Sequence, residues 1–154
     1  MKSKKSCLTI LKKEEVFINM DRVLLKKAEI IERCVKRIKE KTKKDSACIL
    51  NDFDIQDVVV VNLQRACQAA IDSAIYIIRQ KKLGLPQTSS EGFKILAANK
   101  IILSALSEDL QKMVGFRNIA VHEYQELDMN IIKSIVDNKL NNFSDFVKII
   151  LKNE

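Results

Sequence analysis

The stretch from about Asp54 to Lys82 most constrains the fold, because it contains no glycine or proline and is apolar almost throughout. Its apolar residues extend from residues 58–61, four consecutive valines, to residues 75–78. Four valines in a row also suit a strand, but apolar spacing of about 3.6 residues continues on both sides of them. The stretch therefore predicts one long helix that is buried on more than one side.

A helix of this kind needs packing partners on two sides. A chain of 154 residues has the length of one domain. We expect one side of the helix to pack on the chain's own helices and the other side on a second copy. The pattern therefore predicts a homodimer.

The rest of the chain also favours helices, since three glycines and one proline leave little material for the turns of a many-stranded fold. Gly84 and Pro86 form a typical stop after the long helix. Further helices are expected at about residues 21–43, 89–100 and 128–137, from an N-cap at Ser107, and from an N-cap at Asn142. The predicted fold class is all-α, an antiparallel helical bundle of about five to six helices.

Residues 1–19 are interpreted separately. Lys12-Lys13-Glu14-Glu15-Val16 is a peptide whose codons can spell a purine-rich ribosome-binding sequence, a short distance before Met20. Our hypothesis is that residues 1–19 are an N-terminal extension, disordered or not native, and that the domain comprises residues 20–154.

The net charge of +7 is unevenly distributed. Residues 1–44 carry 15 Lys/Arg against 6 Asp/Glu, a net charge of +9, whereas residues 45–154 carry 12 against 14, a net charge of −2. This asymmetry favours a polyanionic partner, and RNA fits it. The alternative is a solvated basic tail and helix face.

The four cysteines show no CxxC spacing, and one histidine cannot complete a zinc site with them. Cys34 and Cys67 lie on apolar faces and are expected to be buried thiols. No run of eighteen or more apolar residues suits a membrane span. We therefore expect a cytoplasmic protein without metal, cofactor or membrane association.

The stretch from Gly115 to Tyr124 is the first candidate for a catalytic site, because it holds the only histidine. Arg117 stands five residues before His122, and Tyr124 stands two residues after it. On an unbroken helix Arg117 and His122 would be about 140° apart around the axis. Asn118 would share a face with His122, and Arg117 would share one with Tyr124.

This motif, entered through Gly-Phe-Arg-Asn, resembles the signature of the HEPN superfamily, and more closely that of HepT-like ribonuclease toxins. The resemblance also covers residues 20–27, residues 53–64, and the loop with Gly84-Leu85-Pro86 and Ser90-Glu91-Gly92-Phe93. It extends from Met20 to about Phe146. It implies a HEPN-type homodimer with the active site at the dimer cleft.

A histidine and an arginine without metal suit RNA cleavage by the substrate's own 2′-hydroxyl. His122 would take or give the proton, since its unperturbed pKa lies near neutrality. Arg117 would stabilise the added negative charge on the phosphate. Asn118 is expected to support the imidazole. Because each chain has one histidine, a histidine acid and a histidine base in one site would have to come from two protomers.

The resemblance further implies a type VII-like toxin–antitoxin pair. The partner would be an MntA-like nucleotidyltransferase antitoxin that neutralises the toxin by transferring AMP to Tyr124. Two alternatives stay open: a non-catalytic helical module that binds nucleotide or serves a nucleotidyltransferase as accessory subunit, and an interaction bundle whose basic N-terminus docks on nucleic acid. For a histidine taken alone, a core or helix-cap role is the commoner one, with Arg117 paired to Glu123 or Glu126.

Overall fold

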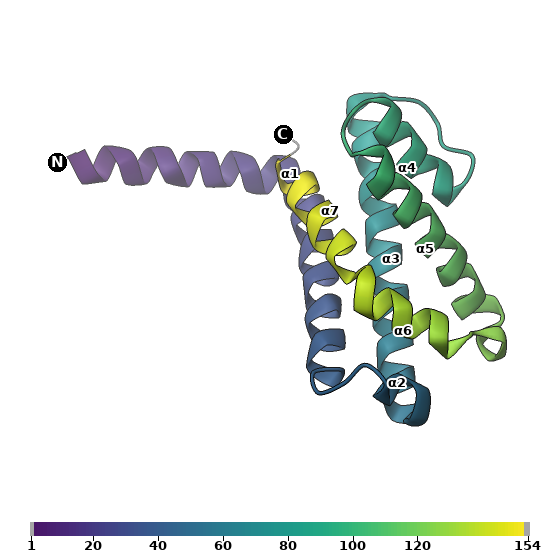
Figure 1. Cartoon of the computed structure of the whole chain (residues 1–154). Helices are drawn as coiled ribbons and strands as arrows, with labels where there is room; N and C mark the ends of the chain where they lie inside the picture. The colour runs from purple at the N-terminus through teal and green to yellow at the C-terminus, as the bar shows by residue number, and fades with distance from the viewer. Residues whose placement is uncertain (1, 153–154) are drawn as a thin grey trace.

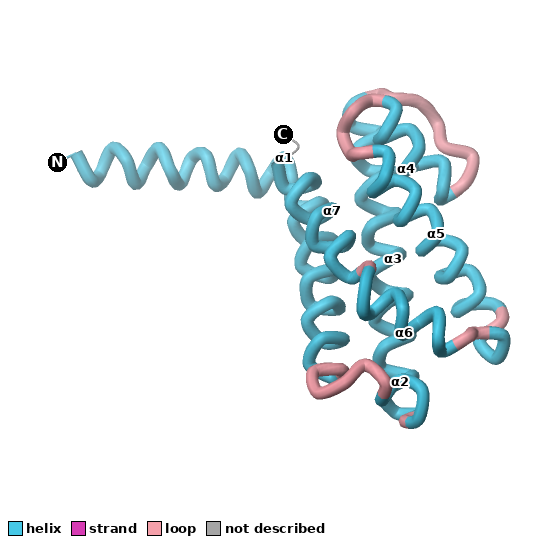
Figure 2. Tube along the Cα trace, in the orientation of Figure 1, coloured by secondary structure: helices cyan, strands magenta, loops and turns pink. Residues whose placement is uncertain are grey.

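The computed structural model describes the backbone of residues 2–152 and the side chains of residues 22–152. Within residues 2–152 all regular structure is helical, which confirms the all-α prediction (Figures 1 and 2). The elements are α1 (Lys2–Lys41), α2 (Cys48–Asn51), α3 (Phe53–Lys81), α4 (Ser89–Ala98), α5 (Ser104–His122), the 3-10 helix η1 (Tyr124–Glu126), α6 (Met129–Asn138) and α7 (Leu140–Lys152).

Helix α3 lies at the centre of the bundle and contacts α1, α2, α4, α5 and α7. The chain direction alternates from α1 to α3, α5 and α7, so the bundle is antiparallel as expected (Figure 1). Phe93 of α4 and Phe146 of α7 are both fully buried and meet edge to face, with ring centroids 5.8 Å apart. This aromatic pair joins the two helices in one core.

The bounds of α3 follow from its sequence. Asp52 caps the helix, because its side chain accepts hydrogen bonds from the backbone N–H groups of Asp54 and Ile55. The helix ends where Lys82 adopts a left-handed conformation with φ 53°, two residues before Gly84 at φ 135°. The structure thus places α3 within one residue of the predicted stretch at each end.

The chain itself covers the apolar sides of α3, which differs from what we expected. Leu63, Ala66 and Ile71, for example, are almost fully buried without a second copy. The large apolar side chains that α3 leaves exposed are Phe53, at its first turn, and Val61. The composition of α3 is therefore explained by five neighbouring helices and is not evidence for a homodimer.

Three details of the helices predicted after α1 are wrong. A one-turn helix, α2, occupies the segment expected to be a loop, so the described chain has one helix more than predicted. Ser107 is buried inside α5, where its Oγ accepts a hydrogen bond from Gln111, and the helix already begins at Ser104. Asn142 lies inside α7 and donates a hydrogen bond to Asp109 instead of capping the helix.

Helix α1 begins at Lys2 rather than near residue 21. The side chains of residues 2–21 lie outside the described part of the chain. The hypothesis that residues 1–19 are an extension that is disordered or not native therefore stays a prediction. Cys34 and Cys67 are buried free thiols, as predicted.

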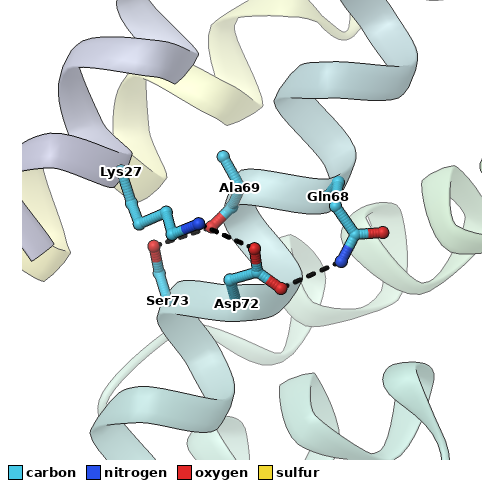
Figure 3. Close-up of polar contacts among 5 residues, drawn as sticks. All are labelled: Lys27, Gln68, Ala69, Asp72 and Ser73. Carbon is cyan, nitrogen blue, oxygen red and sulfur yellow. Dashed lines mark hydrogen bonds and ion pairs between the residues drawn. The ribbon is translucent and has the colours of Figure 1, made fainter. Parts of the chain in front are cut away.

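A partly buried polar contact joins α1 to α3 (Figure 3). Lys27 Nζ lies 2.9 Å from Asp72 Oδ2, and Gln68 donates to the other oxygen of the same carboxylate. Ser73 turns its hydroxyl back to the carbonyl of Ala69. At this level of the bundle the positive charge of α1 thus meets a carboxylate.

Candidate functional site

The motif occupies the C-terminal end of α5, where the helix leaves the core. Leu110, Met113 and Phe116 are buried, whereas Asn118 and His122 are exposed. The helix ends at His122, and the next residue has φ −140° and ψ 51°, which is not helical. Tyr124 then begins η1. The helix is therefore broken before Tyr124, and the expected shared face of Arg117 and Tyr124 does not form.

Arg117 points into the bundle, toward α4 and α3. Its Nη2 lies 3.4 Å from Ser89 Oγ, in the first turn of α4, and its Nε is buried with no hydrogen-bond acceptor among the described residues. Burial raises the pKa of the Cys67 thiol on α3 to about 12, and the positive charge of Arg117 opposes that rise. Arg117 forms no ion pair with Glu123 or Glu126, which contradicts the interpretation of it as a surface ion-pair donor.

His122 is the last residue of α5 and is exposed. It lines a shallow hollow of about 520 Å³ together with Glu123, Tyr124, Gln125 and Glu126. Arg117 does not line this hollow. Asn118 is exposed one turn earlier, and no hydrogen bond joins it to His122 in the described chain. Within one chain the structure therefore brings His122 and Tyr124 to one hollow, which Arg117 does not line.

Tyr124 has a partner that the sequence did not reveal. Its hydroxyl donates a hydrogen bond to Asp57 Oδ1 on α3, at 2.5 Å. Partial burial, this hydrogen bond and the negative charge of Asp57 together raise the pKa of the Tyr124 phenol to about 12. The contact ties η1 to the start of α3 across 67 residues of sequence. Asp57 lies in a segment that carries the resemblance, but no spacing argument assigns it a role.

The geometry provides three chemical groups. Arg117 is a half-buried cation with unused hydrogen-bonding capacity, His122 is an accessible imidazole, and Tyr124 is a phenol held by a carboxylate. A guanidinium of this kind binds phosphate, and an imidazole transfers protons near neutral pH. In the described residues no group of three or more His, Cys, Asp or Glu side chains is arranged to hold a metal ion. Nor does any helix there combine the length and apolar character needed to cross a membrane.

Two relatives named as nucleases match this chain over most of its length. The protein named mRNA nuclease HepT, from Shewanella oneidensis (strain MR-1), is 45% identical over 131 residues, which cover 85% of this chain and 98% of that protein. The protein named tRNA nuclease HepT, from Aphanizomenon flos-aquae (strain 2012/KM1/D3), is 28% identical over 133 residues, covering 86% of this chain and 90% of that protein.

Solved structures give the same result. A crystal structure of a toxin–antitoxin with AMP-PNP matches with a TM-score of 0.81 and 44% identity, over 86% of this chain and 99% of the matched chain. The structure of the tri-AMPylated Shewanella oneidensis HEPN toxin in complex with MNT antitoxin also matches with a TM-score of 0.81 and 44% identity, over 88% and 100%.

A family model described as "Ribonuclease HepT-like" matches residues 31–150, which include both the central helix and the whole motif. The match, the identity to the nucleases and the shared bundle agree with the resemblance seen in the motif. The chain belongs to the HepT-like ribonuclease family.

Proposed function

We propose that this protein is the toxin of a type VII-like toxin–antitoxin pair, acting in the cytoplasm as a metal-independent endoribonuclease. Its site would combine Arg117 and His122 at a homodimer cleft. Membership of the HepT-like ribonucleases supports the activity, and the two relatives named for mRNA and tRNA cleavage indicate RNA as the substrate class.

The observation that carries the proposal is the state of Arg117. A buried donor without an acceptor costs free energy, on the order of 1–3 kcal/mol. Arg117 holds its Nε–H in that state and has only one long hydrogen bond, to Ser89. A phosphate would pair with the guanidinium, which would stabilise the charge that develops on the phosphate during cleavage.

His122 supplies the proton transfer in this proposal. The 2′-hydroxyl of the substrate attacks the adjacent phosphorus and the bond to the 5′-oxygen breaks. One imidazole takes the proton of the 2′-hydroxyl, and the imidazole of the second copy donates a proton to the leaving 5′-oxygen. Each chain has one histidine, and Arg117 of the same chain does not line the hollow in which that histidine lies. A homodimer that faces the two α5 ends toward each other would bring a second His122 and a second Arg117 to one cleft. Asn118, exposed beside His122, would contact the substrate or the partner's imidazole.

Neutralisation would occur at Tyr124. A nucleotidyltransferase antitoxin is the proposed partner, because matched structures are described as toxin–antitoxin complexes and one toxin as tri-AMPylated. The Tyr124 oxygen would attack the α-phosphorus of a bound nucleoside triphosphate, pyrophosphate would leave, and the phenol proton would pass to a base. The transferred phosphate would add negative charge beside His122 and repel RNA from the hollow.

The test compares growth and total RNA in cells that express the chain without its partner. Wild type should arrest growth and cleave RNA, whereas His122→Ala and Arg117→Ala should do neither while accumulating as folded protein. Equal behaviour of all three proteins would refute the catalytic roles and favour the accessory-subunit interpretation. Co-expression with the antitoxin should restore growth and add the mass of AMP to wild type but not to Tyr124→Phe.

A further inference from the structure

A groove of about 490 Å³ lies between α1 and α3. Arg33 and Arg37 line it from α1, and Arg65 lines it from α3. We call it the arginine groove. Its one acidic residue is Asp57. The charges of Arg65 and Arg33 both act on the Cys34 thiol in the groove wall, opposing the larger effect of burial, which raises the pKa of that thiol.

These three arginines outnumber the one carboxylate of the groove and are not paired with it. Among residues 22–152 none of them forms an ion pair or a side-chain hydrogen bond. The same two helices show the opposite arrangement elsewhere, where Lys27 pairs with Asp72 (Figure 3). Three like charges around one groove repel each other unless an anion lies between them. The arginine groove therefore has the charge of an anion site.

Asp57 connects the arginine groove to the motif. It lines the groove and accepts the hydrogen bond of the Tyr124 hydroxyl. Tyr124 in turn lines the hollow of His122. The Asp57–Tyr124 contact thus joins one lining residue of the groove to one lining residue of the hollow. This adjacency gives a strand with one phosphate at His122 a path past Tyr124 toward the groove.

We propose that the arginine groove binds the phosphodiester backbone of the RNA strand beside the phosphate that is cleaved. This inference rests on the proposed ribonuclease function and names the part of the chain that holds the substrate. The guanidinium fork suits phosphate oxygens. No aromatic side chain lines the groove, so bases have no stacking platform there. Binding in the groove contributes affinity that is independent of base sequence.

The experiment uses the full chain with His122→Ala, which prevents cleavage, and a short single-stranded RNA labelled at one end. The dissociation constant is measured by fluorescence anisotropy over a range of salt concentrations. Each phosphate contact to a single strand contributes about 0.7 to the slope of log K against log salt. The double variant Arg37→Gln/Arg65→Gln should therefore reduce the magnitude of this slope by about 1.4. It should also weaken binding, and this loss of affinity should be the same for RNAs of different sequence.

Arg79→Gln is the matched control, since Arg79 is exposed on α3 but does not line the groove. It should leave the slope unchanged. Circular dichroism checks folding, and if the double variant does not fold, each single variant should lower the slope by about 0.7. An unchanged slope in the groove variants, with RNA still bound, would overturn the groove assignment alone. No RNA binding by the His122→Ala chain would overturn the proposed substrate together with it.

Discussion

Helix α3 and the end of α5 contain similar apolar residues in opposite surroundings. In α3, side chains such as Leu63 and Ile78 are fully buried by neighbouring helices of the same chain. At the end of α5, Ile119 is 41% exposed and Val121 is 47% exposed, on either side of Ala120, which is buried. One helix uses its apolar residues to build the core, whereas the other presents them next to His122.

This difference relocates the surface on which a homodimer would form. The sequence pattern suggested a second copy against α3, but beyond Phe53 in its first turn that helix leaves only Val61 exposed among its large apolar side chains. Apolar side chains that remain exposed beside polar ones are typical of interaction sites. If the proposed homodimer forms, the end of α5 is the better candidate for its interface, which would also place two copies of His122 near each other.

The largest expected effect is on stability and separates the two regions directly. Leu63→Ala in α3 should lower the free energy of unfolding by about 2–5 kcal/mol, because it leaves a cavity in a fully buried site. Ile119→Ala should cost less than about 1 kcal/mol in the monomer, since that side chain is already in contact with water. Urea unfolding at low protein concentration measures both values, and equal losses would contradict the distinction.

The second effect concerns Arg117, whose guanidinium points toward Ser89 of α4. Arg117→Lys keeps the charge but cannot reproduce the fork of donors that faces Ser89 and the unsatisfied Nε–H. We expect RNA cleavage to fall by about 100-fold to 1000-fold, the range for removing one donor to a transition state. Single-turnover cleavage of a labelled RNA measures the rate. Ser89→Ala is the control and should change the rate by less than about tenfold, because its hydrogen bond to Arg117 is long. A lysine variant as fast as wild type would contradict the role of the fork.

The long helix shows how much of the fold was predictable. Composition and periodicity alone placed α3 within one residue at each end, because its apolar character is continuous and the chain stops it with a left-handed turn. Short segments were less predictable. Ser107 looked like a cap, yet α5 starts earlier and carries Leu106 into the core, so tertiary packing overrode the local signal.

The residues of the candidate site could be identified in the sequence, but their contacts in space could not. Arg117, His122 and Tyr124 are candidates because their spacing resembles a family signature, which is local information. The contacts of Tyr124 with Asp57 and of Arg117 with Ser89 join residues far apart in sequence, so no helical spacing could indicate them. The assumption of an unbroken helix also hid the fact that α5 ends at His122 and turns Tyr124 toward α3.

The third prediction uses two half-exposed valines as a matched pair. Val121→Asp, at the end of α5, should weaken the proposed homodimer by about tenfold or more, because a carboxylate would be buried without a partner. Val61→Asp, on α3, should leave the dimer intact, although Val61 has a similar exposed fraction of 39%. Sedimentation velocity over a range of concentrations gives the dissociation constants. Dissociation by Val61→Asp alone would restore the interface on α3.

The smallest effect is on the protonation of Tyr124 and concerns the contact that joins the two regions. The hydrogen bond and the negative charge of Asp57 add to the effect of burial in raising the pKa of Tyr124 to about 12. Asp57→Asn removes the negative charge, so this pKa should fall toward the ordinary tyrosine value of about 10. Titration of the phenolate absorbance measures it, with Tyr124→Phe providing the contribution of Tyr76. An unchanged pKa in Asp57→Asn would show that burial alone sets it.

The sign of the shift also defines a pH dependence of stability. A group whose pKa is raised in the folded state holds its proton more tightly there than in the unfolded chain. The stabilisation from Tyr124 is therefore complete below about pH 10 and is lost as the pH rises toward about 12. Because Tyr124 is 40% exposed, solvent screens the effect and the loss should be small. The melting temperatures of wild type and Tyr124→Phe should thus converge between these pH values. A difference that widened instead would mean that the folded protein holds the Tyr124 phenolate beside the Asp57 carboxylate.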